Sequence, residues 1–404
     1  MSIAPPRVPR LPRWFVALVS LVVTWLVATP TAQAYPWMIR HGHKACLTCH
    51  ADPSGAGLLT YMGRSEGDLT LRTRYSGPSE TAGDSAGFLF GAVPEPDGFF
   101  FGGSVRNGVL SVRPETGPSS TQVLQMQADL KAQLEQGKLR AGVSLGVMAK
   151  GAQPAWVTRN PEGNLVSREH WVGVAWGDER PVLLRAGRIN LPFGVRDSIH
   201  TLWVRQKTRT DINDSQQHGA AVAYTGEVLR GELMAIAGNY QVSPDAYRER
   251  GWSAFAEVAL HRKVSAGVST LGAWSRRDLF SRVGGGRMAH GGFVRAAPAK
   301  QLVVIAESDA LVSMPNGGST EVGHATMLML DLEALQGLHV QLIGEATRSA
   351  ASGARASTRA WAGLLWFFAP HADVRADVIE ERLPAAPGEH MTVRSLLLQL
   401  HLYL

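Results

Sequence analysis

A long series of segments with period-two alternation constrains the fold of this chain more than any other feature. Between Leu124 and Leu134 every second residue is apolar. The residues between them are polar, namely Gln125, Gln127, Asp129, Lys131 and Gln133. Such alternation gives a strand one apolar face and one wet face. A half-buried soluble sheet shows the same pattern, so a single segment does not identify the fold.

The number of these segments and the lengths of their connections identify it. We expect sixteen strands, each near the ~10 residues that cross a bilayer at a tilt. They cover residues 98–112, 121–134, 138–149, 166–176, 181–191, 217–226, 228–240, 251–261, 264–276, 286–296, 300–311, 321–333, 338–348, 357–368, 372–382 and 391–404. Short turns alternate with longer polar loops, as in outer-membrane barrels. The sequence therefore predicts an all-β fold, a transmembrane antiparallel β-barrel in the lipid bilayer of a bacterial outer membrane.

Two further patterns agree with a barrel wall. The last strand alternates at Leu396, Leu398, Leu400, Leu402 and Leu404, which resembles the C-terminal assembly signal of such barrels. Six tryptophans near strand ends are expected in the aromatic girdles at the two membrane interfaces. They are Trp171, Trp176, Trp252, Trp274, Trp361 and Trp366.

Residues 1–34 are typical of a secretion signal. Arg7, Arg10 and Arg13 precede an apolar run over 14–28 and a small-residue site at 32–34. A membrane anchor is the alternative, although the run is short for ~30 Å of hydrocarbon. Without the three arginines the formal charge of +6 falls by three, so the remaining chain is only mildly basic. We expect no nucleic-acid binding, because that function needs a concentrated Lys/Arg face.

The only two cysteines, Cys46 and Cys49, form a C-x-x-C-H motif with His50. This is the attachment sequence of a c-type haem, in which both thiols bond to the macrocycle and the imidazole binds iron. Two alternatives remain. The motif and His41 or His43 have the spacing of a zinc site. The two thiols also have the spacing of a redox-active dithiol.

The second axial ligand is open among His41, His43 and Met62. We expect His41, because Gly42 gives the backbone the freedom to fold back over the ring. Water or a barrel side chain is the alternative. If the N-terminal segment plugs the barrel, His200 is one side chain within reach.

Residues 46–64 read CLTCHADPSGAGLLTYMGR. They resemble the single-haem segment at the N-terminus of some bacterial outer-membrane barrel proteins, in which C-x-x-C-H is followed by P-x-G-G-G-L-L-T-x-Y-G-R. Ala56 replaces the middle glycine, and Tyr61-Met62 stands where x-Tyr is expected. The resemblance implies a porin-cytochrome type of protein, with one haem c on Cys46 and Cys49, and His50 as the proximal ligand.

Four parts follow: a signal peptide (1–34), a haem segment (35–64), a Gly/Ser/Pro-rich linker (65–97) and the barrel (98–404). We expect the barrel to house or dock the haem, within its mouth or on the periplasmic side, and to move electrons at or across the outer membrane. One macrocycle cannot bridge ~30 Å of hydrocarbon, so a periplasmic or outer-membrane cytochrome is the expected partner. The alternative is a passive porin whose haem segment is structural, regulatory or a plug. A homotrimer is compatible with both.

The loop after the fifth expected strand contains G-R-x-x-x-P-F-G at residues 187–194. This resembles porin-like barrels, whose third external loop folds inward and narrows the channel. The resemblance implies an anion-favouring constriction that includes Arg188, Arg196 and Arg205. The alternative is an exposed basic loop that binds acidic surface sugars. No hydrolytic constellation is recognisable, and the haem segment offers no distal acid/base pair for a peroxidase, so we expect no enzyme activity.

Overall fold

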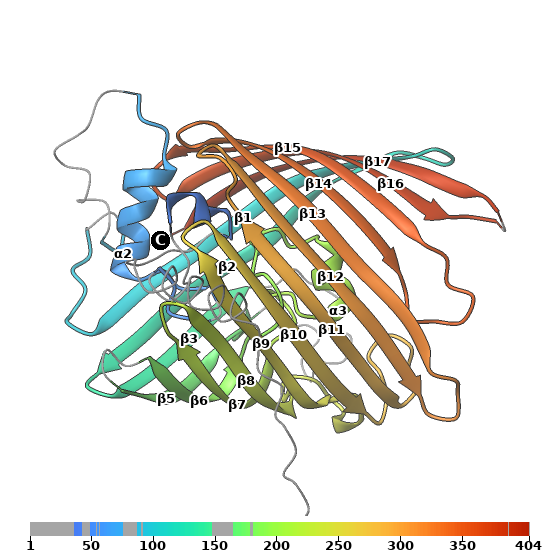
Figure 1. Ribbon diagram of the computed structural model, residues 1–404, viewed down its shortest axis with the longest axis horizontal. Helices are drawn as coiled ribbons and strands as arrows, with labels where there is room; N and C mark the ends of the chain where they lie inside the picture. The colour runs from blue at the N-terminus through green and yellow to red at the C-terminus, as the bar shows by residue number, and fades with distance from the viewer. Residues whose placement is uncertain are drawn as a thin grey trace, which may run out of the picture.

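The computed structural model describes residues 36–42, 49–53, 55, 57–75, 87–89, 92–147, 165–177, 181–386 and 388–403. The expected signal peptide, His43 and Cys46 lie outside these residues. The chain forms a closed antiparallel β-barrel (Figure 1). Each strand pairs with its neighbours in sequence, and β1 (Phe99–Pro114) closes the ring against β17 (His390–Tyr403). Closure leaves no sheet edge, as a barrel in lipid requires.

The wall contains the sixteen expected strands. β4 and β5 both pair with β3, so together they make one interrupted wall strand. Between β1 and β17 the strands are β2 (Ser120–Gln136), β3 (Leu139–Val147), β4 (Leu165–Val166), β5 (His170–Trp176), β6 (Val182–Ile189), β7 (Gln217–Thr225), β8 (Leu229–Gly238), β9 (Arg250–His261), β10 (Val264–Ser275), β11 (Gly285–Ala296), β12 (Leu302–Pro315), β13 (Glu321–Leu335), β14 (Leu338–Arg348), β15 (Ser357–Ala369) and β16 (Ala372–Pro384).

The connections are sorted by length between the two ends. Short ones, such as 262–263 and 336–337, lie at the end where α2 (Tyr61–Glu66) and the C-terminus are found (Figure 1). Longer ones, such as 190–216 and 276–284, lie at the opposite end. We call these the turn end and the loop end. The expected alternation of loop lengths is confirmed. In the described part of the chain, no helix is long and apolar enough to cross a membrane.

Period-two alternation decides which side chains face outward from the barrel. On β17, Leu396, Leu398, Leu400 and Leu402 are exposed on the outer face, whereas Leu397 and His401 are buried. Trp252 and Trp274 lie near the loop end with ring centroids 5.3 Å apart, and Trp176 and Trp366 lie near the turn end. These four are about two-fifths exposed and form the expected girdles. The girdle assignment was wrong for Trp171 and Trp361, which are buried.

Two segments fold into the lumen and fill part of it. One is the N-terminal segment, which includes the 3₁₀ turn η1 (Pro36–His41), α2 and a π-helical turn η2 (Gly67–Leu71). The other is the loop 190–216, which includes α3 (Trp203–Thr208) and which we call the inward loop (Figure 1). Trp37 and Ile39 from the first segment, and Phe193 and Val204 from the second, belong to one buried apolar cluster with inward wall residues. Burial of each such side chain contributes about 1.5–3 kcal/mol.

The N-terminal helical structure extends past the expected boundary at Arg64. η2 continues to Leu71, and Leu71 is buried in the same apolar cluster. Thr73 then donates its backbone N–H to the Phe367 carbonyl, 2.8 Å away on β15. Residues 65–73 are therefore part of the docked segment rather than an unstructured linker.

Candidate functional site

The haem-motif segment has a local structure that explains its residue pattern. His50 and Leu59 form an antiparallel bridge, and the Thr60 N–H donates to the Cys49 carbonyl at 2.8 Å. Thr60 then caps α2, because its hydroxyl accepts the Gly63 N–H at 3.2 Å. A Cβ at position 63 would lie 2.3 Å from the Cys49 carbonyl oxygen. Only glycine there lets the helix pack directly on the second cysteine of the motif.

Buried ion pairs fix this segment inside the barrel. Both carboxylate oxygens of Asp52 accept from Arg185 on β6, at 3.2 and 3.3 Å, and Arg185 also pairs with Glu232 on β8 at 2.7 Å. Breaking a buried pair by removing one partner costs about 3–5 kcal/mol, because the other charge is left uncompensated. Arg40 also pairs with Asp331 on β13, and Arg64 pairs with Glu95, which precedes β1 in the chain.

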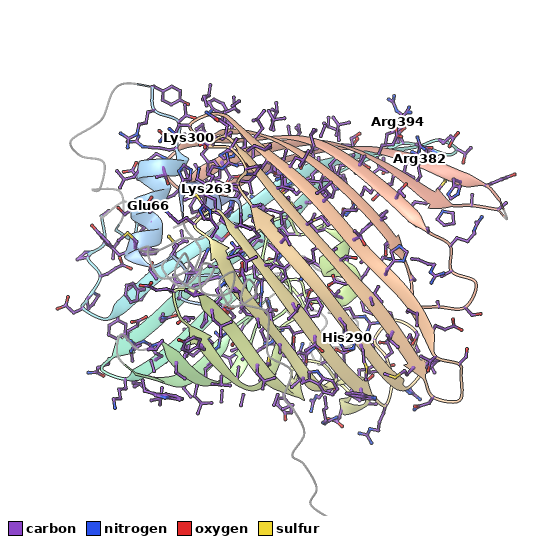
Figure 2. The ribbon with its side chains drawn as sticks, in the orientation of Figure 1. Glu66, Lys263, His290, Lys300, Arg382 and Arg394 are labelled. Carbon is purple, nitrogen blue, oxygen red and sulfur yellow. The ribbon has the colours of Figure 1, made fainter. Side chains whose placement is uncertain are left out.

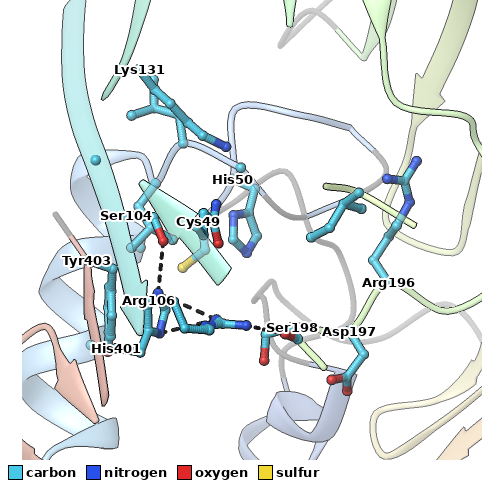
Figure 3. A pocket seen from close by; sticks show the side chains of 18 of the residues that line it. Cys49, His50, Ser104, Arg106, Lys131, Arg196, Asp197, Ser198, His401 and Tyr403 are labelled. Carbon is cyan, nitrogen blue, oxygen red and sulfur yellow. Dashed lines mark hydrogen bonds between the residues drawn. The ribbon is translucent and has the colours of Figure 1, made fainter. Parts of the chain in front are cut away.

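A cavity with about 1090 Å³ of empty space, part of it open to solvent, lies between the N-terminal segment, the wall and the inward loop. Cys49 and His50 line one side, and Arg196 and Asp197 of the loop line another (Figure 3). The wall contributes Arg106 from β1 and His401 from β17, which are paired in register by the closure of the ring. His200 and Met38 also line it.

Histidines and one arginine form a hydrogen-bonded network between the wall and the inward loop. The Nδ1 of His401 is 2.9 Å from an Asp373 carboxylate oxygen, and its Nε2 is 2.9 Å from the Ser104 hydroxyl. Arg106 donates to the Ser198 carbonyl and lies 2.5 Å from the Nε2 of His200. Burial, and then the charge of Arg106, lowers the pKa of His200 well below its usual range. Both ring nitrogens of His200 have partners, since Nε2 contacts Arg106 and Nδ1 contacts the side-chain amide of Asn213.

The predicted haem residues do not all lie at the cavity. Cys49 is buried beside His50 at the cavity, whereas Cys46 lies outside the described residues. His41 has its Nε2 3.7 Å from Glu333 and does not line the cavity, and Met62 is half exposed. The assignment of His41 as distal ligand stays a prediction. Sequence reasoning missed His401, although its phase on the last strand marks it as inward-facing.

The three arginines predicted to form a constriction are buried rather than displayed to solvent. Arg205 pairs with Glu307 and donates to the Phe193 carbonyl at 3.1 Å. Arg188 donates to the Ser167 carbonyl and to Gln241. Arg196 donates to the Leu191 carbonyl and lines the cavity. The loop folds inward as expected, so the alternative of an exposed basic loop was wrong. A role in ion selectivity stays a prediction.

The zinc and dithiol alternatives also bear on this site. Among the described residues, no group of three or more His, Cys, Asp and Glu side chains is placed to hold a metal ion. His41 and His50 lie in different surroundings, one beside Glu333 and the other at the cavity. Because Cys46 and His43 lie outside the described residues, the zinc and dithiol sites are not decided by these contacts.

The fold is that of outer-membrane porins and channels. A loop-deletion form of OmpT, an outer-membrane protein of Vibrio cholerae, matches with a TM-score of 0.59 and 10% identity over 76% of this chain and 99% of that one. The anion-selective porin of Comamonas acidovorans has a TM-score of 0.56 and 12% identity over 76% and 99%. The outer-membrane channel DcaP of Acinetobacter baumannii matches with a TM-score of 0.53 and 12% identity, over 78% of this chain and 100% of that one. No protein-family model and no curated protein matches the chain.

Proposed function

We propose that this protein is an outer-membrane electron-transfer protein whose barrel holds one covalent haem c inside its lumen. The observation that carries the proposal is the position of the motif. Cys49 and His50 line a cavity that is bounded on its other sides by charged and imidazole side chains.

The residues around the cavity fit a haem. Cys46 and Cys49 would bond the macrocycle, and His50 would bind iron. Leu58 and Leu59 supply apolar lining, and the cavity contains basic side chains suited to the two carboxylates of a haem. Haem supplies one-electron redox chemistry when it is bound. The chain itself fixes the depth of the site, since Asp52 is held by Arg185 on the wall.

Access to the site is from the turn end. A second hollow of about 1430 Å³, including its open mouth, is lined by His50, Thr60 and Phe100, so His50 lies between it and the cavity. Lys263 and Lys300 lie in short connections at this same end (Figure 2). These cations provide contacts for the acidic surface of a periplasmic or outer-membrane cytochrome, the partner that we propose.

A passive porin is the second candidate, because similar structures include an anion-selective porin and a channel. In that case the N-terminal segment is a plug. The buried cluster that joins η1, the inward loop and the wall argues against a wide aqueous pore at that depth. Because one similar structure, the OmpT of Vibrio cholerae, is described in a trimer form, we also propose that these barrels associate as trimers.

Reduced-minus-oxidised spectra of protein purified from outer-membrane fractions, with haem staining after denaturation, test the proposal. We expect a covalent haem with a c-type spectrum, and a small conductance in a planar bilayer. Protein without a covalent chromophore would overturn the electron-transfer function. Large, steady conductance in that same preparation would favour the porin.

A further inference from the structure

We propose that Arg196 binds a carboxylate of the haem and so sets the orientation of the macrocycle in the cavity. This inference rests on the proposed function, because it concerns the same site. It gives Arg196 a role other than the pore constriction that the sequence suggested.

The contacts of Arg196 carry the proposal. Its side chain lines the cavity and only 7% of the residue is exposed. One guanidinium nitrogen donates to the Leu191 carbonyl, whereas Nε and Nη1 are buried and have no hydrogen-bond partner in the part of the chain that the structure describes. A buried donor with no acceptor costs about 1–3 kcal/mol, and more when it is charged. Because Arg196 is also a lining residue, we assign the acceptor of these two N–H groups to a molecule bound in the cavity.

Neighbouring side chains do not supply that acceptor. Asp197 follows Arg196 in the chain, but its carboxylate accepts the Ile199 N–H at 2.9 Å. Asp52 and Glu232 are paired with Arg185. Glu169 accepts a hydrogen bond from Asn190, and the second carboxylate oxygen of Glu232 is buried without a partner among the described residues.

Other buried arginines near the site are committed to protein groups. Arg106 donates to the Ser198 carbonyl and contacts the rings of His200 and His401. Arg205 is held by Glu307. Arg196 is the residue of the inward loop that combines a place on the cavity wall with unused donors.

The chemistry of the two groups is complementary. Guanidinium binds carboxylate through two parallel N–H···O bonds, which fix orientation as well as position. A positive charge beside the macrocycle also favours the reduced iron, because that form carries one positive charge less. The same charge stabilises the ionised carboxylate and keeps its pKa low.

Redox titration of Arg196→Gln, Arg196→Lys and wild-type protein in detergent tests the inference. In the Gln variant we expect haem still bound through both thioethers, a midpoint potential shifted downward, and a pH-dependent region of the potential moved to higher pH. The Lys variant should restore most of the potential, since it keeps the charge. Soret circular dichroism should change in the Gln variant because the macrocycle loses an orienting contact.

Arg382→Gln is the matched control, because it also removes one positive charge. Its side chain is 67% exposed at the loop end, outside the cavity lining (Figure 2). We expect wild-type behaviour from it. Wild-type protein without covalent haem would overturn the proposed function and this inference together. Covalent haem whose potential, pH profile and Soret dichroism are identical in wild type and Arg196→Gln would overturn the role of Arg196 alone.

Discussion

The two segments that fill the lumen are held there in different ways. The N-terminal segment enters from the turn end and is attached to the wall by discrete buried ion pairs, namely Asp52 with Arg185 on β6 and Arg40 with Asp331 on β13. The inward loop is tied to the wall covalently at both ends, at β6 and β7. Its contacts with the wall combine the Arg205–Glu307 pair with buried apolar residues.

The two segments therefore contribute to the site in different ways. The N-terminal segment carries the reactive motif, and its position depends on a few wall side chains that hold it. The inward loop belongs to the barrel and supplies one side of the cavity whether or not the segment is docked. Changes in the first should therefore affect the cofactor more than the barrel, and changes in the second should affect both.

Cys49→Ala should have the largest effect. It removes one of the two thiols of the motif. We therefore expect complete loss of the c-type spectrum that is typical of haem held by two thioether bonds. The barrel should still assemble, because the wall strands do not depend on this thiol. Haem staining and heat-dependent gel mobility measure the two properties separately. A variant that stains and absorbs like wild type would remove the haem assignment.

Asp52→Asn should loosen the docked segment. It leaves Arg185 with one carboxylate partner instead of two, so we expect docking to weaken by up to about 3–5 kcal/mol. Limited proteolysis should cut the N-terminal segment faster, with the barrel band unchanged. If the Asp52→Asn variant keeps wild-type protease resistance, this pair does not anchor the segment.

Glu307→Gln is the corresponding change for the inward loop. It leaves the buried Arg205 without its charged partner, so we expect a cost of similar size. The midpoint of thermal unfolding of the barrel should fall, and the haem spectrum should change as well, because the loop forms one cavity wall. A lower midpoint with an unaltered spectrum would show that the loop does not shape the cofactor site.

The cavity histidines should have a spectroscopic effect of intermediate size. Because His200 and His401 line the cavity and His41 does not, we expect His41→Ala to preserve the wild-type spectrum. Alanine at the true distal position should convert low-spin haem to high-spin haem. Electron paramagnetic resonance of the three single variants identifies that position. Conversion in His41→Ala would restore the assignment made from sequence.

Asp245→Asn at the loop end should have the smallest effect. Hydrogen bonds from Arg250 lower the pKa of this exposed carboxyl, so its contribution to stability is present at neutral pH and is lost as the pH falls through the lowered pKa. Solvent screens exposed pairs strongly. We expect unchanged thermal unfolding at neutral pH and a slightly weaker acid dependence. A large loss at neutral pH would show that this loop stabilises the barrel.

The sequence predicted the wall well and the site only in part. The strands follow from alternation, which depends on neighbouring residues alone. Trp171 and Trp361 were placed on the wrong face, because their position near strand ends was given more weight than their phase. His50 and Cys49 were found from a contiguous motif. Arg106 and His401 were missed, because 295 residues separate them along the chain.

By itself, the sequence determined a closed barrel with one long inward loop and a cysteine motif ahead of it. Residue phase and loop length are local properties, and they are sufficient for the barrel. The inward course of the loop was predicted from the resemblance to porin-like barrels. Only the tertiary structure decided which side chains share the cavity with the motif. The ring must close to bring β1 against β17, and two separate segments must fold into the lumen before Arg196, His200 and His401 face the same space as His50.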